Sequence, residues 1–115
     1  MCFNGNVRCT FTCTNRNTDS GLNITVFDND WNRLPFGREA HPADSAEILK
    51  PVHFTAMKQF AEKIAADLSA RFVRIDFYDV DDKLYFGEIT FYPAAGLETF
   101  SPEEWDKKLG EWITL

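Results

Sequence analysis

The segment "FVRIDFYDVDDKLYFGEITFYPAAG", residues 72–96, predicts the central hairpin of this 115-residue chain. Two runs, roughly residues 71–79 and 83–91, alternate apolar and polar side chains, as half-buried strands do. An acidic turn joins the runs, and a Pro/Ala/Gly loop follows them. The charged residues Arg74, Asp76 and Glu88 fall at every second position. We therefore expect an antiparallel pair that carries charges on one face.

The length of the turn decides which side chains lie opposite one another. A three-residue loop at Asp81–Lys83 would place Asp76 directly across from Glu88, and Arg74 across from Thr90 on the same face. A two-residue turn would shift the register by one residue and move the second set to the other face. We take the three-residue loop as the working hypothesis.

Opposed carboxylates at Asp76 and Glu88 need a positive charge or a shared proton, because like charges across a strand pair cost a few tenths to about 1 kcal/mol. Mg²⁺ prefers oxygen ligands and is commonly held by one or two carboxylates together with substrate phosphates. The spacing therefore allows a Mg²⁺–phosphate face with Arg74 beside it. It also allows a salt bridge in which Arg74 joins two exposed carboxylates, and the spacing alone favours this interpretation, because charged residues are common on the solvated face of an antiparallel sheet.

The rest of the chain predicts strands before the hairpin and helices around it. An Asn-Gly turn near the N-terminus, followed by alternating runs at residues 7–13 and 22–27, predicts an antiparallel meander. Residues 29–51 read as an irregular surface connection with at most one short helical turn. Helical spacing of apolar residues predicts a helix over Phe54 to Ser69.

A second helix is predicted near the C-terminus, where "SPEEWDKKLGEWITL" places Ser101 at the N-cap, Pro102 at the first helical position and Glu104 at the capping-box position. The order of strands and helices predicts a single α+β domain, in which an antiparallel sheet carries helices packed on one face.

The composition limits the classes of function. With 44% hydrophobic and 26% charged residues the chain is that of a globular protein, and its net charge of −6 argues against nucleic-acid binding. No run is long enough to span a membrane. Cys2, Cys9 and Cys13 match no spaced zinc motif, so we expect reduced thiols in a cytoplasmic protein.

A family resemblance adds to these inferences. The motif "VRID…LYFGEITFYPAAG" resembles the C-terminal core of ATP-grasp carboxylate–amine ligases, in which an Arg-x-Asp strand pairs with a Glu-x-Asn strand before a Pro-Gly loop. More narrowly, residues 72–113, with "FNGNVR" and "VFDNDWNRLPF" upstream, are similar to TupA-like (teichuronopeptide biosynthesis) ATP-grasp proteins. Those proteins occur in bacterial cell-surface polysaccharide loci and are often labelled glycosyltransferases.

The resemblance implies a role for each residue of the charged face. Asp76, Glu88 and Thr90 would be Mg²⁺ ligands that bridge the phosphates of ATP, Thr90 standing where the wider superfamily has Asn. Arg74 would be the catalytic arginine that steadies an acyl phosphate or a tetrahedral intermediate. The implied reaction activates a carboxylate with ATP and passes it to an amine. Ala94 departs from the family pattern, which has Gly after the proline.

The resemblance also implies that residues 1–115 form a partial ATP-grasp core, without the nucleotide-clamping N-terminal half. The chain is then the Mg–phosphate fragment of a ligase and is expected to be inactive alone. One alternative is a folded, non-enzymatic remnant, with a homodimer covering the surface that the missing half would bury. Another is a glycosyltransferase-associated protein that binds a sugar nucleotide through a metal at Asp76 and Glu88, although the sequence lacks a Rossmann-type glycine signature.

Overall fold

The computed structural model describes residues 1–115 and confirms the α+β class. In chain order the elements are β1 (Cys2–Phe3), β2 (Asn6–Val7), β3 (Thr10–Thr14), β4 (Asn23–Phe27), β5 (Gly37–Arg38), α1 (Phe54–Asp67), β6 (Phe72–Val80), β7 (Lys83–Thr90), the 3-10 turn η1 (Pro93–Gly96), β8 (Phe100–Ser101) and α2 (Glu104–Glu111).

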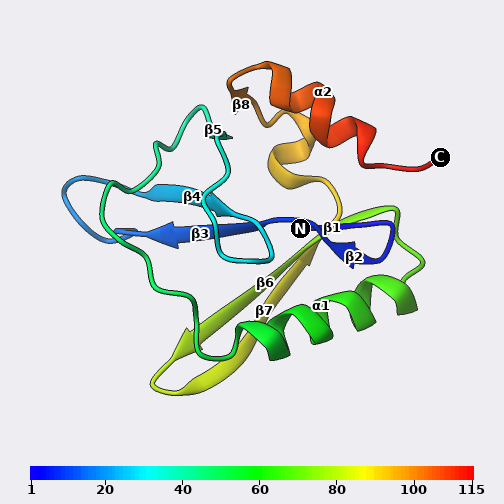
Figure 1. The fold of residues 1–115 in the computed structure, drawn as a ribbon, viewed down its shortest axis with the longest axis horizontal. Helices are drawn as coiled ribbons and strands as arrows, with labels where there is room; N and C mark the ends of the chain where they lie inside the picture. The colour runs from blue at the N-terminus through cyan, green and yellow to red at the C-terminus, as the bar shows by residue number, and fades with distance from the viewer.

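The strands form three antiparallel sheets rather than one. The largest has the order β2-β1-β6-β7, while β3 pairs with β4 and β5 pairs with β8. The β6–β7 hairpin crosses the molecule as its longest strand pair, with α1 alongside it (Figure 1). Both strands of this hairpin begin and end within a residue of the predicted positions. The expected long strand at residues 7–13 is instead divided between β2 and β3.

The hairpin turn differs from the predicted three-residue loop. Val80 pairs with Lys83, so the turn has two residues, Asp81 and Asp82, with φ of 51° and 60°. Positive φ at both central positions is the tight-turn geometry that matches the twist of a hairpin, and Asp tolerates it better than most residues. The three-residue loop was therefore wrong. By itself this turn would move Glu88 and Thr90 to the other face.

A β-bulge opposite Asp76 reverses that shift. The register changes between Phe77↔Phe86 and Ile75↔Ile89, so that Gly87 and Glu88 together oppose Asp76. A bulge inserts one extra residue into one strand and restores the alternation beyond it. Arg74 consequently pairs with Thr90, as predicted, although for a reason that the sequence analysis did not foresee.

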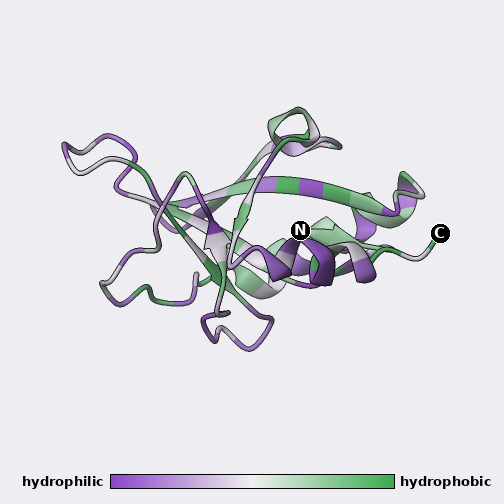
Figure 2. Ribbon diagram, turned by 90° about the horizontal axis from the view of Figure 1, so that it is seen from above, coloured by the Kyte–Doolittle hydropathy of each residue, from purple (hydrophilic) through white to green (hydrophobic).

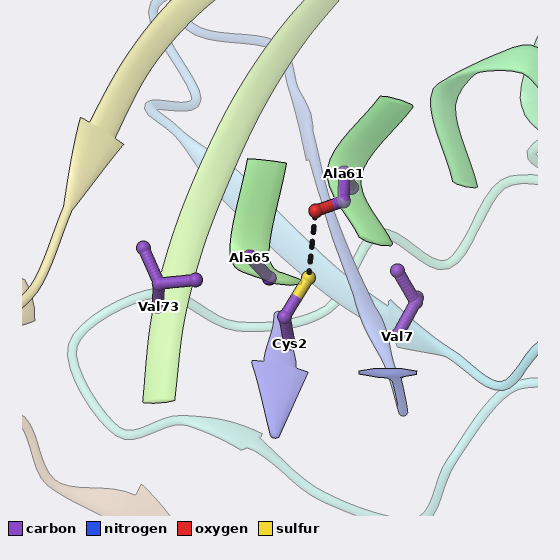
Figure 3. Close-up of a cluster of buried hydrophobic side chains, with 5 residues drawn as sticks. All are labelled: Cys2, Val7, Ala61, Ala65 and Val73. Atoms are coloured by element: carbon purple, nitrogen blue, oxygen red, sulfur yellow. Dashed lines mark hydrogen bonds between the residues drawn. The ribbon is translucent and has the colours of Figure 1, made fainter. Parts of the chain in front are cut away.

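The helix α1 packs against one face of the β1–β6 pair. Cys2, Val7, Ala61, Ala65 and Val73 form a buried cluster in which the Cys2 thiol points to the Ala61 carbonyl oxygen at 3.8 Å (Figure 3). Small residues at Ala61 and Ala65 let the helix approach the strands closely, because they lie one turn apart on the same side of α1. Burial raises the pKa of the Cys2 thiol, which therefore packs as a small apolar side chain.

The helix α2 packs on the opposite face. Phe3 follows Cys2 in β1, so the two side chains point to opposite sides of the strand, and Phe3 packs with Leu109 of α2. The sequence analysis predicted both helices on one face of the sheet, whereas α1 and α2 pack on opposite sides of β1. The members of this aromatic cluster with less than one-tenth exposure are Phe3, Cys9, Val26, Phe36 and Leu109, and Phe11, Phe72, Phe100, Trp105 and Trp112 surround them.

The start of α2 is also not the predicted one. Ser101 and Phe100 form β8, in which Ser101 pairs with Gly37, and α2 begins at Glu104 after Glu103, with no side-chain cap. The N-cap assignment at Ser101 was wrong because pairing with β5 takes that residue into a strand. A local capping signal competes here with a tertiary strand contact, and the contact prevails.

One connection stands out from the rest of the molecule. The loop between β3 and β4 is hydrophilic and projects from the body of the molecule (Figure 2).

Asn4 joins the two ends of the chain, since its side chain donates to the Trp112 carbonyl at 2.7 Å and accepts from the Thr114 amide at 3.0 Å. Neither helix is long and apolar enough to cross a bilayer.

Candidate functional site

The four residues proposed from the sequence lie together on one face of the β6–β7 hairpin. Arg74 and Asp76 are two positions apart on β6, and Thr90 is the direct cross-strand partner of Arg74. Glu88 occupies the bulge opposite Asp76. This face is the one that also carries Phe72, so it continues from the aromatic cluster out to solvent.

The Arg74 guanidinium holds the group together through four hydrogen bonds. Its Nε donates to Asp76 Oδ1 at 2.9 Å, and Nη2 donates to Asp76 Oδ2 at 3.0 Å, which is a two-pronged pair. The same Nη2 reaches Glu88 Oε1 at 2.9 Å and Thr90 Oγ1 at 3.2 Å. One cationic nitrogen is therefore surrounded by three oxygen atoms from three residues.

This geometry is the salt bridge that the spacing allowed. It also shows whether the oxygen atoms present are suitable ligands for Mg²⁺. Two carboxylates and a hydroxyl already converge on one positive centre, and all three are hard oxygen donors of the kind that Mg²⁺ prefers. No group of three or more His, Cys, Asp or Glu side chains is arranged so that it could hold a metal ion by itself. A metal at this face would accordingly need Thr90 and the oxygen atoms of water or a ligand, as Mg²⁺ commonly does.

Gly87 is the residue that makes the bulge possible. A Cβ atom at this position would lie 2.9 Å from the Tyr78 ring and 3.0 Å from the Asp76 carbonyl oxygen. Glycine allows the two backbones to approach here, and the approach sets the register that brings Glu88 to Arg74. The sequence analysis missed this role, although an isolated glycine inside a strand pattern is a known bulge signal.

Comparison with known proteins supports the family resemblance. A family model described as TupA-like ATPgrasp matches residues 1–114. The chain belongs to the TupA-like ATP-grasp family. Comparisons with curated proteins and with solved structures found no match. The bulged β6–β7 pair described above is therefore a feature of a TupA-like ATP-grasp chain.

The sequence analysis missed a second arginine near this face of the TupA-like chain. Arg38 in β5 forms an ion pair, through Nε, with Oε1 of Glu98, whose side chain is only 8% exposed. Desolvation and the nearby charge of Arg74 both lower the pKa of Arg38. The sequence offered no signal for this pair, since its two residues are sixty positions apart and meet only because β5 pairs with β8.

His53 and Asp79 form a second link between distant parts of the chain. Asp79 accepts from the His53 backbone amide at 3.2 Å, and its other oxygen lies 2.8 Å from His53 Nδ1. The hydrogen bond to Asp79 raises the pKa of His53, and the same bond lowers the pKa of Asp79. The pair fastens the tip of the hairpin to the N-terminus of α1.

The loop after β7 has an unusual backbone. Ala94 and Ala95 adopt φ of 50° and 56°, and Gly96 adopts 78°. Left-handed conformations cost an alanine roughly 1–2 kcal/mol each, whereas glycine adopts them freely. The glycine expected after the proline in this family is thus replaced by Ala94 at a position that is strained for any residue with a Cβ atom.

Proposed function

We propose that the chain provides the Mg–phosphate face of an ATP-grasp carboxylate–amine ligase that acts in bacterial cell-surface polysaccharide biosynthesis. ATP and Mg²⁺ are its cofactors, a carboxylate and an amine are its substrates, and the cytoplasm is its compartment. The observation that carries the proposal is the convergence of Asp76, Glu88 and Thr90 on one cationic centre in a chain of this family.

In this function Asp76, Glu88 and Thr90 would hold Mg²⁺. When bound, the ion supplies charge neutralisation for the phosphates of ATP. Once the carboxylates are engaged, Arg74 loses two of its partners and can donate to an oxyanion above the sheet face. A guanidinium fixed by its strand meets charge as it develops on oxygen, and this lowers the barrier to acyl transfer.

Titration calorimetry of the chain with MgCl₂, then with Mg·ATP, tests the proposal. We expect heat on titration of the wild type and none for Asp76→Asn or Glu88→Gln, with a free energy of unfolding that is unchanged or raised. Removing either carboxylate relieves the repulsion between the two, so stability should not fall. Asp67→Asn, in an exposed i,i+4 pair of α1, is the matched control and should bind as the wild type does.

The same titration distinguishes a second candidate function, a folded domain without catalysis. The four hydrogen bonds of Arg74 favour this alternative, because Asp76 and Glu88 both have a positive partner without a ligand. Absence of metal binding, together with a loss of stability in both variants, would refute the ligase proposal and support a structural salt bridge.

A further inference from the structure

The helix α1 covers only part of the sheet on which it lies. Its buried residues Ala61 and Ala65 pack with Cys2, Val7 and Val73, which belong to β1, β2 and β6. No residue of β7, the outermost strand on the other side of β6, belongs to this cluster. Figure 1 shows the helix running beside the hairpin. The side of β7 that faces α1 is thus left without a cover.

This uncovered side of β7 is apolar. Phe86 is the direct partner of Phe77, Ile89 is the direct partner of Ile75, and both partners pack against the α1 cluster. Because direct partners share a face of the sheet, Phe86 and Ile89 lie on the side of α1. Phe86 is 55% exposed and Ile89 is 37% exposed. Two large apolar side chains therefore meet solvent beside the helix.

The flank of α1 nearest to β7 is apolar as well. On the far flank, Glu62 accepts from the Val7 amide of β2 at 3.1 Å, and β2 lies at the opposite edge of the sheet from β7. Successive residues of a helix are turned by about 100°, so Phe60 and Ile64 lie on the flank away from Glu62 and toward β7. Phe60 is 55% exposed and Ile64 is half-buried.

The exposed rings of the helix and the strand lie at a similar level. His53 at the start of α1 bonds to Asp79 near the end of β6, so the helix and β6 run antiparallel from a fixed point. A helix rises about 1.5 Å per residue and a strand about 3.3 Å, so Phe60 lies about as far from His53 as Asp76 lies from Asp79, roughly 10 Å. Helical side chains tilt toward the N-terminus, which brings the Phe60 ring toward the level of Phe86, whose cross-strand partner is next to Asp76.

The surface between α1 and β7 carries no charged side chain. We call it the apolar strip, and it consists of Phe60, Ile64, Leu84, Phe86 and Ile89. The other face of the hairpin carries Arg74, Asp76 and Glu88, which are engaged with one another. Strand addition at the edge of β7 is disfavoured, because Lys83 and the bulge at Gly87 interrupt that edge. A partner of the apolar strip therefore contacts the face of the hairpin and not its edge.

We propose that the apolar strip is a dimer interface, in which Phe60 of one protomer packs against Phe86 of its partner about a two-fold axis. Such an axis repeats each contact, so both exposed rings of both protomers are covered. The accessible surface of 7470 Å² exceeds that of a compact protein of 13.2 kDa by roughly 1,000 Å². Each partner in a stable complex buries roughly 800 Å². The Arg74 face points away from this contact, so the dimer does not depend on the proposed ligase function.

A pair of variants with complementary charges tests the contact. Phe60→Lys and Phe86→Glu each place a charge in both halves of an apolar interface, so either variant alone should raise the dimer dissociation constant at least tenfold. In an equimolar mixture, the new lysine of one protomer meets the new glutamate of its partner, while the second contact keeps both phenylalanines. Sedimentation velocity at about 100 µM should show dimers for the wild type and the mixture, and monomers for each variant alone.

Tyr85→Lys is the matched control. Tyr85 precedes Phe86 in β7 and is 51% exposed, but it lies on the opposite face with Arg74, so this variant should dimerise as the wild type does. All three side chains are at least half exposed, so the circular dichroism of each variant should be unchanged. A monomeric wild type, or a mixture that stays monomeric, would refute the proposed contact. Dissociation by Tyr85→Lys but not by Phe86→Glu would place the interface on the charged face and would also refute it.

Discussion

Single residues at Ala94 and Ala95 carry backbone strain beside the candidate site. Both are in the left-handed region, which Cβ atoms disfavour, and both precede Gly96 in the same turn. Strain of this sort is held in place by its surroundings, here the buried Pro93 and the strands that lead into and out of the turn. The family pattern indicated a glycine here, and the backbone gives the reason.

Ala94→Gly is expected to stabilise the chain by about 0.5–1 kcal/mol. Relief of roughly 1–2 kcal/mol of strain exceeds the entropy that a new glycine adds to the unfolded state. Urea unfolding measures the difference. Ala66→Gly, at an exposed position inside α1, is the control with the opposite sign and should cost about 0.5–1 kcal/mol. A loss of stability in both variants would contradict the left-handed assignment at Ala94.

His53 and Asp79 make stability depend on pH. The pKa of His53 is raised above its ordinary 6.5, so its contribution is complete below pH 6.5 and is lost as the pH rises through the folded-state value. The pKa of Asp79 is lowered below 3.8, so its contribution is present above pH 3.8 and is lost as the pH falls through the folded-state value. The pair therefore stabilises the fold most between these limits.

We expect thermal unfolding temperatures to fall between pH 6 and pH 9, and His53→Gln to remove most of that fall. His41→Gln is the control, because His41 lies in the loop after β5 and forms no ion pair. Calorimetric scans across the range provide the measurement. A variant at His53 that keeps the full alkaline decline would show that another group causes it.

At the scale of elements, the bulge in β7 determines the candidate site. The two-residue turn alone would put Glu88 and Thr90 on the face covered by α1, and the bulge at Gly87 returns them to the side of Arg74. Charged side chains thus reach one point through two compensating irregularities. The predicted turn was one residue too long, and the predicted strand lacked the bulge. The two errors offset each other, so the predicted pairing of Arg74 with Thr90 was still correct.

Gly87→Ala is expected to destabilise the chain by about 1–3 kcal/mol, because its Cβ atom would overlap Tyr78 and the Asp76 carbonyl. The strand would lose the bulge or spread from β6, and Arg74 would lose its contacts with Glu88 and Thr90. Urea unfolding and the Arg74 Nε–Hε resonance provide the two readouts. Gly110→Ala, in α2 with no atom near the new Cβ, should instead be neutral or stabilising. An undisturbed Arg74 resonance in Gly87→Ala would contradict the role given to the bulge.

At the scale of the whole molecule, the chain buries little of itself. Only 15 of 115 residues are buried, and the accessible surface of 7470 Å² exceeds the roughly 6,400 Å² expected for a compact protein of 13.2 kDa. The excess lies partly on the hairpin, where Tyr78, Tyr85 and Phe86 are each more than half exposed. An excess of roughly 1,000 Å² compares with the ~800 Å² that each partner buries in a stable complex.

We expect the isolated chain to dimerise through this hairpin, as the sequence analysis allowed. Sedimentation velocity at 10–100 µM checks the assembly state, and Phe86→Lys should raise the dimer dissociation constant at least tenfold by placing a charge in an apolar contact. Leu49→Lys, at a still more exposed apolar residue in the connection before α1, should leave the dissociation constant unchanged. A monomer at every concentration would contradict the dimer.

The sequence by itself determined the hairpin, α1, the α+β class and the residues of the charged face, because alternation and helical spacing record which side of each element is buried. The motif around Arg74 and Glu88 also indicated the family. Only the tertiary structure decided the register, since the bulge depends on a close contact between Gly87 and Asp76. It also decided the pairing of Ser101 with Gly37, the placement of the helices on opposite faces, and the Arg38–Glu98 pair. Each of these depends on tertiary contacts whose energy exceeds the local preference of the chain for a turn, strand or helix. Local sequence patterns therefore do not predict them.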